Sequence, residues 1–311
     1  MTTKTLDDRK VFITAQVGPE EKLSKIAGSG ADGIGLLEAE CPHNLSPVEA
    51  EDQYFAFFRE AAQTPGQVPV TLLLPDLGAE INGPVPKVRG IRHLLSSPGM
   101  YTPFLRAVLR AGTHGCYELA LPMVSQVAEV LAFKEIMGEV RARLESEGIG
   151  CSTPSAGVVV EAPSVIPAIK TLMFESIFFL IGQNYVKYLM ADQSISGERE
   201  QEAYFSQAFM LQSLAMVESL KGRKGGARIS APAVRDPVAV PILVGMGFNH
   251  LVAPPEMIPA IKGNVESISF REVCLIASKT TSYWDPHQAR EYARERLARL
   301  KSLPGPGNKK T

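Results

Sequence analysis

The sequence predicts a single closed parallel (β/α)8 barrel, the TIM-barrel fold, followed by one helix and a short tail. Short apolar runs rich in β-branched and aromatic residues alternate with longer amphipathic stretches along the chain. Eight such runs fall within about 250 residues, a typical length for this barrel. Their regular spacing, with no Gly-rich nucleotide-binding turn after the first run, favours the barrel over an open doubly wound sheet, which stays the alternative. The expected strands are residues 10–17, 33–37, 68–74, 116–124, 156–162, 176–182, 227–233 and 249–254.

Helix signals lie between these runs. Ser46 followed by Pro47 is typical of a helix N-cap and first helical position. Several helices are expected to stop at glycines. We expect the barrel to occupy residues 1–283, an amphipathic helix packed on the barrel or a partner to occupy 284–301, and a disordered tail to occupy 302–311. The expected barrel helices are residues 19–30, 46–63, 100–115, 125–148 and 198–222.

Composition excludes several classes of protein. The chain has 311 residues and a formal net charge of −1, which gives no electrostatic case for binding nucleic acid or an anionic membrane. The N-terminus lacks an apolar signal region, and no run reaches the ~18 apolar residues of a membrane span. The four cysteines lie far apart, without metal-ligand spacing. We therefore expect a cytoplasmic protein with reduced thiols.

Polar side chains follow two neighbouring predicted strands. Glu161 closes the run "VVVEA", and Gln183 and Asn184 close the run "FFLIGQN". In a (β/α)8 barrel the chemistry lies at the carboxyl ends of the strands. A carboxylate and two amides at this position are typical of a metal or ligand site. The next residues, Tyr185 and Lys187, do not supply the second carboxylate that a metal site would use.

Several stretches in register resemble the phosphoenolpyruvate (PEP)-utilising enzymes. The resemblance is to the C-terminal PEP-binding barrel of enzyme I of the sugar phosphotransferase system, pyruvate phosphate dikinase and PEP synthase, and it covers roughly residues 10–265. It implies a barrel of the PEP/pyruvate-binding type. The stretches that carry it include "GADGIGLLEAE" (30–40), "VRGIR" (88–92), "VVVEAPS" (158–164), "FFLIGQN" (178–184) and "RDPVAVPILVGMGFNHLVAP" (235–254).

The resemblance implies a site for a trianionic substrate. In the family, arginines bind the substrate, a Glu and an Asp hold Mg2+, a Cys protonates the enolate carbon, and phosphate passes to a histidine on a separate domain. Arg89 matches the substrate arginine, Glu161 the metal-binding glutamate and Asn184 the asparagine beside the metal-binding aspartate. Glu40 matches a glutamate of the second-strand motif.

At other positions the sequence differs from the family pattern, and these differences remove groups that the family uses for its chemistry. Tyr185 occupies the position of the second metal carboxylate, Glu38 and Leu73 stand where arginines are expected, and Ser230 replaces the acid-bearing cysteine. A serine hydroxyl is a far weaker acid than a thiol. With Glu161 as the one matched carboxylate, Mg2+ would bind weakly. No cofactor is firmly predicted, Mg2+ stays an open alternative, and conventional PEP phosphotransfer is not expected.

Candidate roles follow from these positions. Glu161 is the candidate catalytic and metal residue, and Lys187, His43 and Ser230 are further catalytic candidates. Each of these residues also has an alternative without a catalytic role. Glu161 would form a salt bridge to Arg89 or Lys187, Lys187 would be a solvated side chain at a helix start, and His43 would be a surface imidazole. The candidate substrate-binding residues are Arg89, Asn184, Glu40 and Gln183.

Three functions stay open. The first is a repurposed barrel enzyme acting on a small carboxylate-containing or phosphorylated metabolite. The second is a non-catalytic pseudoenzyme that serves as a metabolite sensor or as the partner subunit of another protein. The third is a residual PEP- or pyruvate-dependent phosphotransferase that needs a phosphohistidine domain from a separate chain. The resemblance also implies a homodimer.

Overall fold

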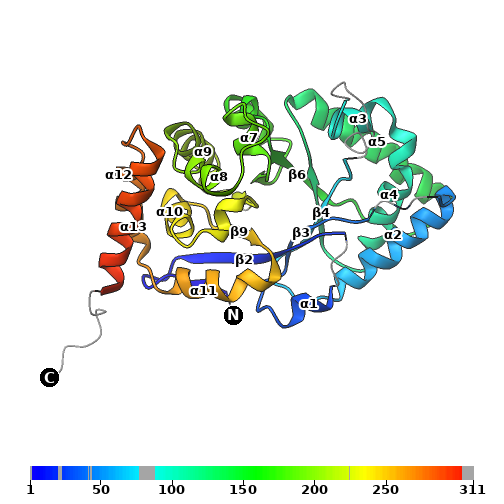
Figure 1. Cartoon of the computed structure of the whole chain (residues 1–311). Coiled ribbons are helices and arrows are strands. Elements are labelled where there is room, and N and C mark those ends of the chain that lie inside the picture. Colours follow the sequence, from blue (N-terminus) through cyan, green and yellow to red (C-terminus); the bar gives the residue numbers. More distant parts are fainter. Residues whose placement is uncertain are drawn as a thin grey trace.

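The strands of the computed structural model close into a barrel (Figure 1). The structure describes residues 2–19, 23–40, 42, 44–76, 88–223 and 225–302. Strands β2 to β9 pair in chain order, every pair is parallel, and β2 also pairs with β9. The predicted (β/α)8 barrel is confirmed, and the open sheet is excluded.

Each of the eight predicted runs overlaps one barrel strand, which is usually shorter than predicted; β6 begins one residue before its predicted run. Their ends turn into the loops that shape the barrel mouth, as at Met123, whose positive φ of 59° ends the run after β5. One further strand, β1, pairs antiparallel with β2 outside the barrel and was not predicted. The strands are β1 (Thr3–Lys4), β2 (Lys10–Val17), β3 (Ile34–Leu37), β4 (Val70–Leu73), β5 (Tyr117–Leu121), β6 (Ser155–Val160), β7 (Phe179–Ile181), β8 (Ala227–Ile229) and β9 (His250–Ala253).

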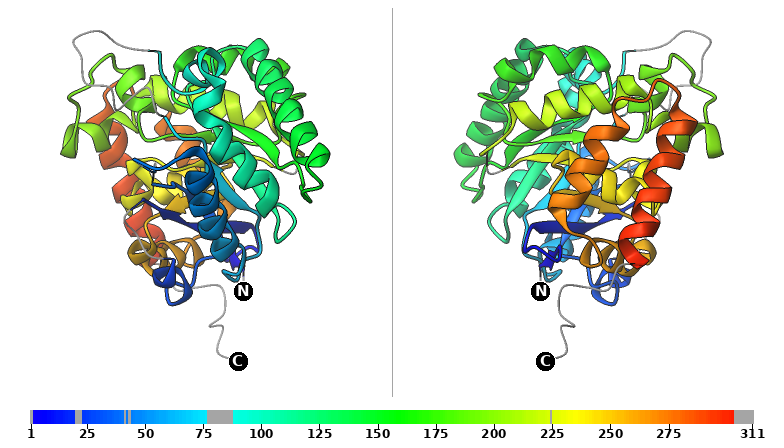
Figure 2. Two further views of the ribbon diagram at one scale, coloured as in Figure 1. Left: turned by 90° about the vertical axis from the view of Figure 1, so that its right-hand side faces the viewer. Right: turned by 90° about the vertical axis from the view of Figure 1, so that its left-hand side faces the viewer.

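The helices surround the barrel (Figure 2). The predicted cap at Ser46 is confirmed as a capping box: its Oγ accepts a bond from the Glu49 amide at 3.3 Å, and the Glu49 carboxylate accepts one from the Ser46 amide at 2.9 Å. The α-helices are α1 (Ser24–Ala27), α2 (Pro47–Ala62), α3 (Ile91–Ser96), α4 (Pro98–Ala111), α5 (Val127–Ser146), α6 (Ile169–Leu172), α7 (Tyr185–Leu189), α8 (Gly197–Ala203), α9 (Gln207–Ser219), α10 (Ala239–Met246), α11 (Ile258–Glu266), α12 (Phe270–Thr280) and α13 (Pro286–Ser302); the 3₁₀ helices are η2 (Pro163–Ala168), η3 (Pro232–Arg235) and η4 (Pro255–Met257).

The predicted helix 198–222 is wrong in one respect, because it is two helices, α8 and α9. Tyr204 and Phe205 are buried at the break. Ser206 then caps α9 by accepting a bond from the Phe209 amide at 3.2 Å. The two aromatic side chains enter the core from a turn, and the serine starts a new helix.

The ends of the chain differ in detail from the prediction. The helix expected over 19–30 is described only as α1, with residues 20–22 outside the described part. The helix expected over 284–301 is α13, and its N-terminus is capped by Asp285, which accepts a bond from the Gln288 amide at 2.9 Å. Before it lies α12, which was not predicted and runs beside α13 (Figure 2). Ser302 ends α13, and residues 303–311 of the expected tail lie outside the described residues. Among the described helices, none has the length and apolar content that a membrane crossing requires.

A polar network lies inside the barrel toward the N-terminal ends of the strands. Arg228 Nη1 donates to Glu118 at 2.7 Å and to Thr71 at 3.1 Å, and its guanidinium lies 3.9 Å from the centre of the Phe178 ring. His250 shares a 2.8 Å hydrogen bond with the Thr14 hydroxyl. Burial, reinforced by the charge of Arg228, lowers the pKa of His250 well below its ordinary value, so this imidazole is neutral.

Candidate functional site

A pocket of about 220 Å³ lies at the carboxyl ends of the strands. Its apolar wall includes Leu36, Val159 and Leu180, which belong to a cluster of buried residues inside the barrel. The polar wall comes from the loops that follow β3, β4, β6, β7 and β8. The polar lining residues are Glu38, Asp76, Arg89, Glu161, Gln183, Asn184 and Ser230.

Glu161 is the most buried carboxylate of this pocket. It directly follows β6, is 9% exposed, and accepts a 3.0 Å bond from the Asn184 side-chain amide. Burial raises its pKa above the ordinary value; the negative charges of Asp76 and Glu38 add to that rise, while the Asn184 hydrogen bond and the charge of Arg89 oppose it. A raised pKa makes the ionised carboxylate a stronger base and keeps the protonated form populated to higher pH than usual.

Gly182 gives the Glu161 side chain its room. A Cβ at position 182 would lie 3.0 Å from Glu161 Cγ and 2.8 Å from Val159 Cγ1. The glycine of "LIGQN" therefore lets the ends of β6 and β7 approach closely.

Arg89 is held in place by Asp76. Its Nε and Nη2 lie 2.9 and 2.8 Å from Asp76 Oδ2, and Asp76 Oδ1 accepts a bond from the Gly90 amide at 2.7 Å. Partial burial acts to lower the pKa of Arg89, but the hydrogen bond and charge of Asp76 more than offset it, so this pKa is raised. Among the described residues, Arg89 forms its ion pair with Asp76. Both Arg89 and Glu161 are described, and the salt bridge between them, which was the non-functional alternative for Glu161, is not formed.

A hydrogen-bond chain links the end of β8, through Gln16 of β2, to the end of β3. The Ser230 hydroxyl donates to Gln16 Oε1 at 3.1 Å, and Gln16 Nε2 donates to Glu38 Oε1 at 3.2 Å. Ser230 is 2% exposed. Gln16 was missed by the sequence reasoning. The signal was present, because Gln16 is a polar residue near the carboxyl end of a largely apolar strand.

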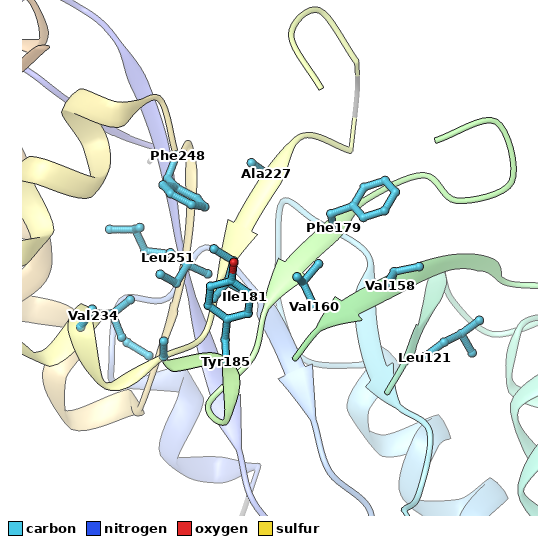
Figure 3. Packing of buried hydrophobic residues seen from close by; sticks show 14 of the residues in the cluster. Leu121, Val158, Val160, Phe179, Ile181, Tyr185, Ala227, Val234, Phe248 and Leu251 are labelled. Atoms are coloured by element: carbon cyan, nitrogen blue, oxygen red, sulfur yellow. The ribbon is translucent and has the colours of Figure 1, made fainter. Parts of the chain in front are cut away.

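Tyr185 lies outside the pocket, packed in the hydrophobic core (Figure 3). It is fully buried, its ring meets the Phe209 ring edge-on at 6.1 Å between centroids, and its hydroxyl donates to Gln212 at 2.5 Å. Burial raises the pKa of its hydroxyl. The position that carries the second metal carboxylate in the family pattern therefore points into the protein interior here.

The structure gathers some of the predicted site residues and separates others. Arg89, Glu161, Gln183, Asn184 and Ser230 line one pocket. Glu40 and Lys187 do not line this pocket. Glu40 is exposed, and it lies two residues beyond Glu38, the residue of the same loop that does line the pocket. Lys187 is half-buried on α7. His43 lies outside the described residues.

The pocket does not reproduce the two-carboxylate magnesium site of the family pattern. Both oxygens of Asp76 are engaged by Arg89 and Gly90, and position 185 offers no ligand. Within the described ranges, no group of three or more His, Cys, Asp or Glu side chains is arranged to hold a metal ion. Magnesium prefers octahedral oxygen ligation that combines one or two carboxylates with substrate phosphates.

Comparison with known families decides the relationship. The sequence pattern described as PEP-utilising enzyme, PEP-binding domain, matches residues 1–270. The chain belongs to the PEP-utilising enzyme family. It is 28% identical over 287 residues to the phosphoenolpyruvate-dependent phosphotransferase system protein of Salmonella typhimurium, covering 87% of this chain and 38% of that protein. It is 26% identical over 288 residues to the phosphoenolpyruvate-protein phosphotransferase of Priestia megaterium, covering 87% and 50%. The chain thus spans half or less of the length of these two relatives.

Solved structures share the fold of this PEP-utilising enzyme barrel. A citrate lyase from Burkholderia xenovorans LB400 superposes with a TM-score of 0.55 at 14% identity, covering 98% of this chain and 97% of that one. Haloferax volcanii malate synthase gives a TM-score of 0.52 at 14% identity, with coverages of 93% and 90%. At this identity the likeness establishes the barrel architecture alone.

The raised pKa of Glu161 predicts a pH dependence of stability. Between the ordinary value of 4.5 and the raised value, the folded protein binds this proton more tightly than the unfolded chain does. The stabilising contribution is fully present below pH 4.5 and is lost as pH rises through the raised pKa. Urea unfolding of wild type and Glu161→Gln across pH 4 to 8 checks this: the variant gains stability relative to wild type as pH rises. A constant difference across that range would contradict it.

Proposed function

We propose that this PEP-utilising enzyme barrel acts on a small metabolite carrying a carboxylate or phosphate group, and that Glu161 transfers a proton to or from it. The observation that carries this proposal is the buried Glu161, with its raised pKa, in a pocket that also holds the Arg89 guanidinium. Perturbed carboxyl groups in concave sites are typical of catalytic acids and bases.

The proposed step is proton exchange next to a carbonyl group. Arg89 binds the anionic group of a keto acid, and the ionised Glu161 removes a proton from the carbon beside the carbonyl. The electron pair of that C–H bond moves toward the carbonyl oxygen, giving an enolate. The protonated Glu161 then returns a proton to the same carbon. The Asn184 amide, which donates to Glu161, orients the carboxylate for both directions of transfer.

The charge balance of the pocket disfavours a trianionic ligand such as PEP. The described pocket lining carries the carboxylates of Glu38, Asp76 and Glu161 against the one guanidinium of Arg89. A charged hydrogen bond contributes about 1.5–3 kcal/mol to binding. Because arginines of the family pattern are replaced here, a trianion loses that contribution for each arginine that is absent. A monoanionic keto acid needs fewer cations. The homodimer and the cytoplasmic location stay predictions.

A ligand screen followed by isotope exchange tests the proposal. Calorimetry with pyruvate, oxaloacetate and PEP, each with and without Mg2+, identifies the ligand. Proton NMR in D2O then follows exchange at the carbon beside its carbonyl. Glu161→Gln keeps the side-chain size and the oxygen that accepts from Asn184, so we expect binding within a few-fold of wild type and exchange slowed at least ~100-fold. Arg89→Ala should abolish binding.

The control is Arg92→Ala, because Arg92 pairs with Glu129 and Ser125 and does not line the pocket. This variant should bind and exchange like wild type. If the wild-type protein binds a ligand but does not catalyse exchange, the result would contradict the proposed enzyme and favour a metabolite sensor. Micromolar binding of PEP that requires Mg2+ would reinstate phosphotransfer chemistry.

A further inference from the structure

The side chains that face the barrel interior lie in layers of different polarity. Successive residues of a strand point to opposite sides, so every second residue faces inward. Toward the N-terminal ends of the strands lies the polar network of Arg228 and Glu118. Toward the carboxyl ends lie the polar groups of the Glu161 pocket. Between the two lies an apolar layer, which includes Leu36, Leu73, Val159 and Leu180.

This apolar layer forms the floor of the Glu161 pocket. Val159 lies two residues before Glu161, Leu36 lies two residues before Glu38, and all four side chains line the pocket. Two residues of strand span roughly 7 Å, so the apolar side chains lie deeper in the barrel than the carboxylates. Leu73 also lines the pocket; it is half-buried, whereas Leu36 and Val159 are buried, so it offers more of its surface to a ligand.

The mouth of the pocket suits a ligand with one negative charge. Arg89 is the one cationic side chain of the described lining, and Asp76 holds it in place. Glu38 belongs to the same lining, where its Oε1 accepts a 3.2 Å bond from Gln16 Nε2. A second carboxylate on the ligand would meet like charges in this lining. The end of the ligand that lies away from Arg89 is therefore uncharged.

The volume of the pocket limits the length of the ligand. It measures about 220 Å³, the volume of about seven water molecules in the liquid. Pockets for drug-sized ligands are larger, roughly 300–1,000 Å³. The space above the apolar floor therefore suits pyruvate extended by about one or two carbons.

We propose that the substrate is a keto acid with one carboxylate and a short alkyl side chain, and that Leu73 is a specificity-determining residue. The carboxylate lies at Arg89, and the carbon that exchanges its proton lies at Glu161. The alkyl group continues from that carbon and lies against Leu73 and Val159. This inference rests on the proposed function, because it names the class of keto acid on which Glu161 acts.

Titration calorimetry with keto acids of increasing length tests the apolar floor. The series is pyruvate, 2-oxobutanoate and 3-methyl-2-oxobutanoate. Burial of each added carbon strengthens binding about fourfold, so we expect the last acid to bind about 15-fold more tightly than the first. Proton NMR in D2O follows exchange with the same three acids.

Two acids of equal chain length test the charge of the mouth. Oxaloacetate has the chain length of 2-oxobutanoate and carries a second carboxylate. Without Mg2+, we expect oxaloacetate to bind at least tenfold more weakly than 2-oxobutanoate. Glu38→Gln should narrow that difference at least threefold.

A variant of the floor tests the role of Leu73. Leu73→Ala should reduce the affinity ratio of 3-methyl-2-oxobutanoate to pyruvate at least threefold. Leu131→Ala is the control, because Leu131 is 44% exposed on α5 and does not line the pocket; it should keep the wild-type ratio. Thermal melting shows whether Leu73→Ala folds, and the wild-type series decides the inference if it does not.

This inference and the proposed function fail on different results. Exchange with equal affinity for all three acids would keep the proposed function and overturn this inference. Affinity that rises with chain length but without exchange would keep the ligand class and overturn the function. The inference is also overturned if oxaloacetate binds as tightly as 2-oxobutanoate, if Leu131→Ala lowers the ratio as much as Leu73→Ala, or if no keto acid binds.

Discussion

Replacing Tyr185 by aspartate should destabilise the fold by about 3–5 kcal/mol and should not create a magnesium site. The substitution restores the carboxylate of the family pattern, but in this chain it places that group among core side chains (Figure 3). Removing a buried aromatic ring costs about 3–5 kcal/mol, and an unpaired buried carboxylate adds to that cost. Urea unfolding at pH 7 measures the loss, and calorimetry with Mg2+ should detect no new site.

Tyr185→Phe is the matched control. It keeps the ring against Phe209 and removes only the hydrogen bond to Gln212, so we expect a loss of about 1 kcal/mol. A Tyr185→Asp protein that is as stable as wild type and binds Mg2+ would show that this side chain can turn toward the barrel mouth.

Arg228→Ala should lower the free energy of unfolding by about 3–5 kcal/mol. The side chains of Arg228 and Glu118 are 6% and 8% exposed, and their 2.7 Å bond lies inside the barrel. Removing one partner of a buried pair leaves the other charge without compensation in a medium of low polarity, which is the origin of this cost. The alanine also removes the contact of the guanidinium with the Phe178 ring. Chemical denaturation measures the change.

The control for this ion pair is the double variant Glu118→Leu with Arg228→Met. Replacing both charges by apolar side chains of similar size is often neutral, so we expect the double variant to be more stable than Arg228→Ala. Equal stability of the two variants would show that packing, and not the buried charge, sets the cost.

Local patterns in the sequence predicted the barrel well. Apolar runs of strand length identified all eight barrel strands, and the rule that barrel chemistry lies at the carboxyl ends of strands selected Glu161, Asn184, Arg89 and Ser230 for one pocket. These inferences succeed because strand patterning and the position of a residue at a strand end are local properties.

Properties that depend on pairing across the barrel were not predicted. Glu118 and Arg228 each lie within an apolar run, and the sequence does not reveal that the two meet across 110 positions. The same holds for Gln16, whose partners Glu38 and Ser230 come from other strands.

The orientation of side chains at the start of α7 was also beyond sequence reasoning. Asn184 lines the pocket, while the next residue, Tyr185, packs in the core. At a helix start, successive side chains turn by about 100° because the helix has 3.6 residues per turn. The direction of the first turn depends on how the helix packs, which here is set by Phe209 of α9.

The pairing of β2 with β9 has a consequence for how the polypeptide is made. The first barrel strand to leave the ribosome keeps one side unpaired until residues 250–253 have been synthesised. Until then the nascent chain also presents the open side of β8, and unpaired strand sides readily join those of other molecules. Nascent chains that stall before this point should therefore aggregate, whereas synthesis of β9 allows both open sides to pair at once.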